Sequence, residues 1–363
     1  MKIVNEVKVI YKDRVVGYIS QFGQLTVFSY DFDWLKDGFS ISPIVLPLSD
    51  KKYVSKNSLG ISLHGVFFDC LPDGWGFVLL KKFLRQQDID LDHVNEVTLL
   101  TLLSKNGYGA LEFVPTQFLE NSEDIDLVLI EQEISNVLKD IETRYLNYLI
   151  SKGSSTGGSR PKVYATIDNE DYIIKFAGPN DPINIGEQEY KINQLAIKCG
   201  LNVNKCKLFE VNGKKVFGAI RFDRVNKEKI HCISLAGLLD IDFKTTLLDY
   251  RHLFQVVSLL CPVDLEEAYR RLVFNYLIEN KDDHPKNFSF YYDEINKTYR
   301  LAPAYDLTRT IDLVEHQMGV NYKGNATKKE IIEFGISFNL SKKFCVDTYE
   351  FIEKQVELSG IKK

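Results

Sequence analysis

Hydrophobic and polar residues alternate along the first thirty positions of the chain. The stretch VKVIYKDRVVGYISQFGQLTVFSY (residues 7–30) places β-branched and aromatic residues between polar ones and breaks at KDR and FGQ. Alternation with period two, interrupted by turn residues, predicts a small antiparallel meander. From about Ser62 to Leu103 the apolar spacing changes to three and four, which predicts helices. Asp73, in LPDGWG, is the predicted N-cap of one of them.

A second group of strands follows a loop rich in glycine and serine. KVYATI and DYIIKF flank the polar turn DNED, which predicts a hairpin over residues 162–176. The next segment, GEQEYKINQLAIKCG, has helical spacing, with Gly200 ending the helix and one buried stripe formed by Glu189, Ile192, Ala196 and Cys199. KCKLFEVNGKKVFGAIRFDRV predicts two more strands, and the pattern beyond His231 is mostly helical, with one further hairpin.

The length and composition of the chain predict a globular protein of more than one domain. The chain has 363 residues, of which 45% are hydrophobic and 26% charged, and this length exceeds what one hydrophobic core usually supports. The acidic stretch ENSEDIDLVLIEQEI marks a change in composition, so we place the first boundary between Phe113 and Asp126. We expect an N-terminal subdomain of strands and helices, a β-rich lobe and a helical lobe, over residues 1–120, 121–230 and 231–363.

Charge and cysteine content limit the function classes. The net charge of -5 argues against a chain that coats nucleic acid by itself, because phosphate neutralisation needs clustered Lys and Arg. No stretch has the length and apolar character of a signal peptide or a membrane span, so we expect a protein that is neither exported nor membrane-spanning. The six cysteines are far apart and form no C-x-x-C pair, which favours reduced thiols and the cytoplasm. They are Cys70, Cys199, Cys206, Cys232, Cys261 and Cys345.

The segment NKDDHPKNFSF (residues 280–290) concentrates charge between a helix and a strand. The apolar helix LEEAYRRLVFNYLIEN ends at its start, and NFSFYY and YRLAPAYD flank the turn DEINKT after it. An antiparallel return brings the end of the second strand beside the start of the first. We therefore expect Asp306 to lie close to Asn287 and to the loop that carries Asp282.

Two carboxylates and an amide in this arrangement predict magnesium-dependent phosphoryl transfer. Mg²⁺ prefers such oxygen ligands, keeps several waters and bridges substrate phosphates. An acid five residues before an asparagine, followed by an acid after a short hairpin, is the spacing with which kinases position a catalytic Asp and two metal ligands. Taken alone, the D-x-x-x-x-N spacing is also typical of a solvated turn.

Kinases also need a lysine that contacts the nucleotide phosphates and a helix glutamate that holds it. Lys175 shares a strand face with Ile173, which we expect to be apolar and inward, so its ammonium needs a partner. Glu189, on the buried stripe of the next helix, is the predicted partner. A strand lysine that extends to solvent is the alternative.

The loop GSSTGGSRPK precedes this hairpin. It has no G-x-G-x-x-G, and it fails as a Walker A loop because Ser159 and Arg160 stand where Gly-Lys should close it. Its backbone N–H groups and hydroxyls, with the charges of Arg160 and Lys162, predict a cover for triphosphate oxygens. A flexible linker is the alternative.

These residues resemble the HipA-type serine/threonine kinases, the toxins of HipBA toxin–antitoxin modules. The resemblance rests on TGGSRPK, YIIKF, EYKINQLA, RFDR, NKDDHPKNFSF and LAPAYDL, and on VGYISQFGQLTVFSYDFDWL and DCLPDGWG in the N-terminal region. It covers nearly the whole chain. It implies an α+β fold with two kinase-like lobes, a β-rich N-lobe and a helical C-lobe, and an extra N-terminal subdomain.

The resemblance also assigns roles to residues of this chain. It implies Asp282 as the catalytic Asp, Asn287 and Asp306 as Mg²⁺ ligands, and Lys175 as the lysine that binds ATP phosphate. Ser155 falls at the autophosphorylated serine, although Ser154 and Thr156 are its neighbours and the assignment can shift by one residue. The loop has Arg160-Pro161 where the family has Gln-Glu. The further ATP-binding residues that we predict are Ser154, Ser155, Thr156, Gly157, Gly158, Ser159, Lys162, Glu189, His284 and Lys286, where His284 either orients the loop or fills it.

The implied function is transfer of the ATP γ-phosphate to a protein serine. Family members act on aminoacyl-tRNA synthetases and are restrained by a HipB-like DNA-binding antitoxin, which would make the main contact with operator DNA. One alternative is a small-molecule kinase on the same scaffold, similar to aminoglycoside or choline kinases, which also use a D-x-x-x-x-N loop. Another is a catalytically silent module that acts in a complex with an antitoxin and DNA.

Overall fold

The computed structural model describes residues 1–56, 62–117, 125–153, 155 and 157–361. The chain forms two compact units, which are described separately here. The first unit comprises Met1–Gly186, Lys207–Ile233 and Gly237–Ile241, and the second comprises Glu187–Cys206, Ser234–Ala236 and Asp242–Lys363. In the described residues, no helix is both long enough and apolar enough to cross a membrane.

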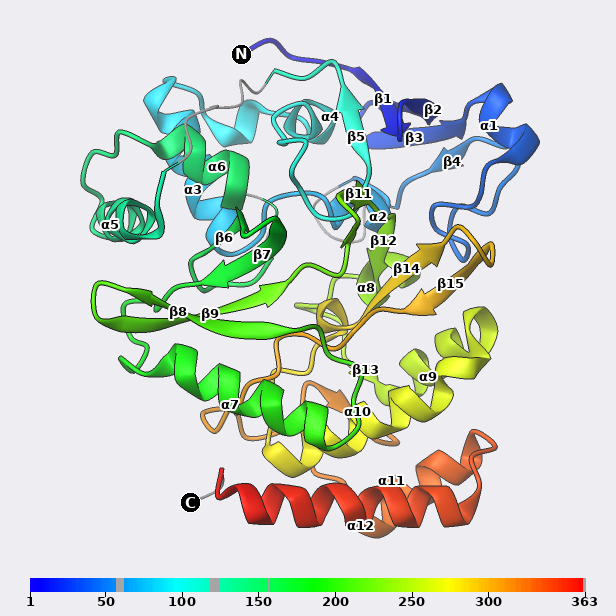
Figure 1. Ribbon diagram of the computed structural model, residues 1–363. Coiled ribbons are helices and arrows are strands. Elements are labelled where there is room, and N and C mark those ends of the chain that lie inside the picture. Colours follow the sequence, from blue (N-terminus) through cyan, green and yellow to red (C-terminus); the bar gives the residue numbers. More distant parts are fainter. Residues whose placement is uncertain (57–61, 118–124, 154, 156, 362–363) are drawn as a thin grey trace. The chain divides into compact units, whose positions relative to one another are not determined.

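A five-stranded sheet of order β4-β3-β2-β1-β5 opens the first unit (Figure 1). The meander predicted from the alternation of residues 7–30 is confirmed, because β1 (Glu6–Tyr11), β2 (Arg14–Phe22) and β3 (Leu25–Tyr30) pair antiparallel in succession. The two edges are β4 (Tyr53–Val54) and β5 (Glu112–Val114). The helices of this region are α1 (Phe32–Asp37), α2 (Gly65–Phe68), α3 (Trp75–Gln86) and α4 (Glu96–Leu100), with a 3₁₀ turn η1 (Leu91–His93).

The start of α3 differs from the prediction by one residue. Gly74 is the N-cap, and the Asp73 carboxylate accepts a hydrogen bond from the Gly74 N–H at 2.8 Å instead of capping the helix. Gly74 has φ 49° and ψ -111°, a conformation that residues with a Cβ rarely adopt. The prediction of Asp73 as N-cap is therefore wrong, because the helix entry depends on a backbone conformation that glycine supplies.

A four-stranded sheet of order β6-β7-β9-β8 is the second large sheet of the first unit. Its strands are β6 (Lys162–Ile167), β7 (Glu170–Lys175), β8 (Cys206–Val211) and β9 (Lys214–Ile220). The predicted hairpin over residues 162–176 is confirmed, and its turn residues Asp168 and Asn169 both have positive φ, as a two-residue hairpin turn requires. One face of the sheet buries Val163, Tyr172 and Ile174 in a common core with α3, α5 (Leu127–Leu138) and α6 (Leu146–Gly153). A small hairpin, β10 (Arg224–Val225) with β11 (Glu228–Lys229), follows β9.

Helices dominate the second unit. They are α7 (Ile185–Lys198), α9 (Tyr250–Leu260), α10 (Leu265–Ile278), α11 (Lys328–Ser337) and α12 (Lys342–Ser359). Helix α10 packs between α9 and α12, and α11 packs on α12 (Figure 1). The predicted stripe of α7 is confirmed, because Glu189, Ile192, Ala196 and Cys199 are all buried.

The remaining elements of the chain are short. The predicted hairpin consists of β14 (Ser289–Asp293) and β15 (Thr298–Leu301), in a register that pairs Phe290 with Leu301. Strand β13 (Leu248–Asp249) pairs parallel with β16 (Met318–Gly319). The others are β12 (Cys232–Ser234), α8 (Leu235–Leu239) and the 3₁₀ turns η2 (Pro262–Asp264) and η3 (Pro285–Asn287).

Candidate active site

The charged loop begins where α10 ends. Glu279 caps this helix with φ 61°, which turns the chain sharply away from the helix axis. Asn280 follows, only 2% exposed, and its Nδ2 donates to the Asn275 Oδ1 at 3.1 Å and to the backbone carbonyl of Asp306 at 3.5 Å. One buried amide thus ties the start of the loop both to α10 and to the segment that follows β15.

The predicted Asp-x-x-x-x-Asn loop is closed by its own side chain. The Asn287 Nδ2 donates to the backbone carbonyl of Asp282 at 2.7 Å. The returning hairpin reaches the same loop, since the Tyr305 hydroxyl donates to the Lys286 carbonyl and lies 2.6 Å from the Ser289 hydroxyl. Asp306 has φ 51°, in the left-handed region that Asp and Asn tolerate better than most residues. The hairpin return therefore brings Asp306 to the loop of Asp282 and Asn287.

Asp283, which sequence reasoning left without a role, is the buried anchor of this loop. It is 0% exposed and accepts hydrogen bonds from the Tyr250 hydroxyl at 2.8 Å and from the backbone N–H groups of Gln317 and Met318 at 3.0 and 3.3 Å. The His316 Nδ1 lies 2.9 Å from the same carboxylate. Burial, with a further contribution from the Asp283 charge, raises the pKa of Tyr250 well above its usual value, so this hydroxyl stays protonated and donates. Asp283 thus holds the loop from the inside.

The segment Glu315–Met318 is a second feature that the sequence did not reveal. The Gln317 Nε2 donates to the Asp282 Oδ1 at 3.0 Å, while the His316 ring stacks on Tyr276 with centroids 3.9 Å apart. The pairing of β13 with β16 places this segment. It has no periodicity or motif of its own, so no local signal could have found it.

His284 and Lys286 both contact Phe243. The His284 ring lies 4.8 Å from the Phe243 ring between centroids, and its Nε2 lies 3.9 Å from the Asp282 Oδ1. The Lys286 Nζ lies 5.4 Å from the centroid of the same Phe243 ring, within cation–π range. These contacts place two predicted ATP-binding residues on one aromatic side chain.

The donor set fits a magnesium ion that also binds substrate phosphate. In the described residues, no group of three or more His, Cys, Asp or Glu side chains could hold a metal ion. Mg²⁺ does not need such a group, because it usually binds one or two carboxylates and completes its coordination with water and phosphate oxygens. Since the Asn287 Nδ2 is engaged by the Asp282 carbonyl, Oδ1 is the atom with which this amide can bind a cation.

Two buried lysines face each other in the first unit. Lys162 and Lys175 are directly opposite in the β6–β7 register and are 4% and 9% exposed. Two ammonium groups on directly opposite residues repel each other, and a phosphate group that binds both would offset this repulsion. Our expectation that the face of Lys175 and Ile173 is the apolar inward face is wrong, because the core side of β7 carries Tyr172 and Ile174. Glu189 is 3% exposed but belongs to the second unit, and its pairing with Lys175 stays a prediction.

The predicted phosphate-covering loop is docked on the entry of α3. The Trp75 N–H donates to the Gly158 carbonyl at 2.9 Å, and a Cβ on Gly74 would overlap that same carbonyl. Gly157 and Gly158 both have φ 67°, a conformation that favours glycine. The segment DCLPDGWG, which contributed to the family resemblance, therefore contacts the predicted phosphate-covering loop.

The charged and hydroxyl residues of the loop differ in their surroundings. The Arg160 Nε pairs with Asp181 at 3.1 Å, so a side chain expected to offer free charge to phosphate has a carboxylate partner. Ser159 is exposed, and a Cβ on Gly158 would lie 2.7 Å from the Lys162 Nζ. Ser154 and Thr156 lie outside the described residues.

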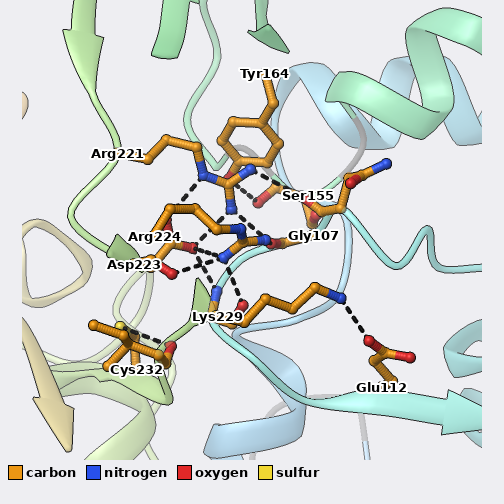
Figure 2. Close-up of polar contacts among 12 residues, drawn as sticks. Gly107, Glu112, Ser155, Tyr164, Arg221, Asp223, Arg224, Lys229 and Cys232 are labelled. Carbon is orange, nitrogen blue, oxygen red and sulfur yellow. Dashed lines mark hydrogen bonds and ion pairs between the residues drawn. The ribbon is translucent and has the colours of Figure 1, made fainter. Parts of the chain in front are cut away.

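Ser155 is buried beside the RFDR motif of the first unit (Figure 2). It is 7% exposed, its carbonyl accepts a hydrogen bond from the Tyr164 hydroxyl at 3.1 Å, and its Oγ would lie 2.8 Å from a Cβ on Gly107. The Arg221 guanidinium stacks on the Tyr164 ring at 3.4 Å from the centroid. Burial raises the pKa of Tyr164 to about 12, against the opposing effect of Arg221. The hydroxyl therefore remains a donor to Ser155 at neutral pH.

The RFDR motif itself is a buried ion cluster. Asp223 accepts from Arg221 at 2.9 and 2.7 Å and from Arg224 at 3.0 Å, while both arginines donate to the carbonyl of Gly107 (Figure 2). Burial acts to raise the pKa of Asp223, but the two guanidinium groups outweigh it and hold the pKa below its usual value. The cluster fastens the loop of residues 106–109 to the end of β9.

Comparisons with known proteins place the chain in one family. The model for the HipA-like C-terminal domain matches residues 154–358, more than half of the chain, and the model for the HipA N-terminal domain matches residues 7–114. Two curated relatives from Sinorhizobium fredii, named "Putative kinase Y4dM" and "Putative kinase Y4mE", are each 25% identical, over 78% and 85% of this chain and 72% and 78% of their own lengths.

A solved structure shows the same fold. HipA of the Shewanella oneidensis toxin–antitoxin system, solved with HipB and its operator DNA, matches with a TM-score of 0.76 and 18% identity over 97% of this chain and 89% of that chain. The α+β fold and its kinase-like arrangement, expected from the sequence, are thereby confirmed. The chain therefore belongs to the HipA family, and it is a HipA-like protein of the kinase type.

Proposed function

We propose that this chain is an ATP- and Mg²⁺-dependent protein kinase that transfers the γ-phosphate to a protein serine. The observation that carries the proposal is the closed loop in which Asn287 binds the carbonyl of Asp282, with Asp306 tied to the same loop through Asn280. This is the arrangement that phosphoryl transfer needs, because catalysis there consists mainly of positioning and charge stabilisation. The curated relatives named putative kinases support it.

In the proposed reaction Asp282 accepts the proton of the acceptor serine. The serine oxygen forms a bond to the γ-phosphorus, the bond from this phosphorus to the bridging oxygen breaks, and ADP leaves. Gln317 orients the Asp282 carboxylate by its hydrogen bond to Oδ1. When bound, Mg²⁺ neutralises the charge that develops on the phosphate oxygens, and Asn287 and Asp306 would hold it. Lys175 and Lys162 contact the phosphates of ATP.

The proposal extends to regulation and partners. Ser155 is the predicted autophosphorylation site, and its burial means that the loop has to leave Gly107 before the hydroxyl can react. By analogy with the Shewanella oneidensis assembly, a HipB-like DNA-binding antitoxin restrains the kinase and supplies most of the contact with operator DNA. The net charge of -5 agrees with that division. An aminoacyl-tRNA synthetase is the proposed substrate class.

Intact mass of the full chain before and after incubation with Mg-ATP tests the catalytic proposal. We expect the wild type to gain phosphate and peptide mapping to place it on Ser155. Asp282→Asn and Asp306→Asn should gain none, and Asn keeps the left-handed backbone of residue 306 accessible. Asp312→Asn, at an exposed acid, is the matched control and should behave as the wild type. Undiminished phosphorylation of both site variants would refute the assignment.

A further inference from the structure

A small cavity in the first unit is lined mainly by basic side chains and has no role in the proposed reaction. It has a volume of about 150 Å³. It lies beside the cluster drawn in Figure 2, at the end of the β6–β7 hairpin where Thr166 and Asp171 stand opposite each other. The basic residues in its wall are Lys152 of α6 and, from the segment 221–229, Arg221, Arg224, Lys227 and Lys229.

Positive charge is in excess around this cavity. Asp223 is shared by Arg221 and Arg224, and Glu112 pairs with Lys229 at 2.5 Å. The cavity wall adds one more carboxylate, Asp171. Five cations of the wall face three carboxylates, one of which, Glu112, is shared with Lys105 at 3.8 Å, so positive charge exceeds negative charge by at least two. Lys152 and Lys227 make no ion pair in the part of the chain that the structure describes.

The two guanidinium groups are fixed before any ligand arrives. Arg221 donates to the carbonyls of Asn106 and Gly107 at 3.0 and 2.8 Å, and Arg224 donates to those of Gly107 and Gly109 at 2.9 Å each. Both side chains are largely buried, with 5% and 8% exposure, whereas Lys227 is exposed. A fixed pair of arginines beside two lysines that make no ion pair in the described residues is suited to an oxyanion, because the arginines lose little side-chain entropy on binding.

The size of the cavity limits what it can hold. Pockets for drug-sized ligands have volumes of roughly 300 to 1,000 Å³, so this one has room for a single small group. A group with two negative charges matches the surplus charge. We propose that this cavity binds a phosphate dianion, either free or as the head of a small phosphate monoester. Its occupant lies against the Arg221 side chain that stacks on Tyr164, and so lies one side chain away from the anchor of Ser155.

Calorimetric titration of the full, unphosphorylated chain with inorganic phosphate, at constant ionic strength set with chloride, tests the proposal. We expect saturable binding by the wild type and at least tenfold weaker binding by the double variant Lys152→Gln/Lys227→Gln. Neither lysine has an ion-pair partner in the described residues, so the fold should be retained, and an unchanged Tm checks this. Lys51→Gln, at an exposed lysine, is the matched control and should bind phosphate as the wild type does.

Two further arms separate this cavity from other sources of binding. Lys175→Ala removes a predicted contact with ATP phosphate, so any phosphate bound at that contact is lost in this variant, whereas the binding that depends on Lys152 and Lys227 should persist whether or not the kinase proposal holds. O-phosphoserine replaces phosphate in the second arm, and tighter binding than that of phosphate identifies a monoester as the ligand. Absence of saturable binding, equal affinity of the double variant and the wild type, or loss of binding in Lys175→Ala would overturn the proposal.

Discussion

Substitution of the adjacent acids Asp282 and Asp283 should affect two different properties, activity for Asp282 and stability for Asp283. The Asp282 side chain is 48% exposed and is assigned to the chemistry, whereas Asp283 is 0% exposed and holds the loop through Tyr250, His316 and the backbone. We therefore expect Asp282→Asn to abolish phosphorylation without a change in stability. Asp283→Ala should reduce the free energy of unfolding strongly.

The size of the second effect follows from the contacts of Asp283. Three hydrogen-bond donors and the His316 ring surround its carboxylate at 2.8 to 3.3 Å. A buried group left without its partner costs about 1 to 3 kcal/mol, and removing one partner of a buried charged network costs about 3 to 5 kcal/mol. Because domains are stable by only about 5 to 15 kcal/mol, Asp283→Ala should lose a large fraction of the total. Asp283→Asn keeps the shape and should lose less.

Urea unfolding followed by circular dichroism, together with Mg-ATP-dependent phosphorylation of the same preparations, measures both effects. The expected pattern is a stable, inactive Asp282→Asn and a destabilised Asp283→Ala. If Asp283→Ala unfolds at the wild-type urea concentration, the buried-anchor interpretation is wrong. If Asp282→Asn loses as much stability as Asp283→Ala, the division of roles between the two acids is wrong.

Three further substitutions test other parts of the structure. Gly74→Ala introduces a Cβ at positive φ that overlaps the Gly158 carbonyl. It should lower the free energy of unfolding by more than the roughly 1 to 2 kcal/mol of the left-handed backbone alone, and it should speed proteolysis of residues 153–162. Gly23→Ala, at positive φ in open space, is the control, and equal losses in thermal unfolding would contradict the contact between Gly74 and the loop of Gly158. Burial lowers the pKa of His231 from 6.5 to about 4, so the unfolded chain binds more protons than the folded chain between these pH values, and stability falls as the pH falls. His231→Gln should therefore remove about 2 kcal/mol from the decrease in the free energy of unfolding between pH 7 and pH 5. If urea unfolding gives the variant and the wild type the same pH dependence, this assignment to His231 is wrong. Asp223→Asn should lower the free energy of unfolding by about 3 to 5 kcal/mol in the same assay, because it leaves two buried guanidinium groups without their carboxylate, and a value within 1 kcal/mol of the wild type would contradict that role.

Features that depend on neighbours in the sequence were determined by the sequence itself. The alternation of residues 7–30, the hairpin over residues 162–176 and the stripe of α7 follow from periods of two and about 3.6 residues, and the structure confirms them. The closeness of Asp306 to the loop of Asp282 was also predictable, because a short hairpin has a single antiparallel return. The role of Asp306 as a Mg²⁺ ligand stays a proposal.

Only the tertiary structure decided the partners that lie far apart along the chain. Gln317 reaches Asp282 across 35 residues, and Arg221 reaches the carbonyl of Gly107 across 114. The role of Asp283 was hidden for the same reason, because its hydrogen-bond partners come from α9 and from residues 316–318. The period of hydrophobic residues along an element indicates which face of that element is buried, but it does not indicate which distant segment covers that face. Packing of the complete chain makes that choice, and it sets which acid of an adjacent pair is held inside and which is left to face a substrate.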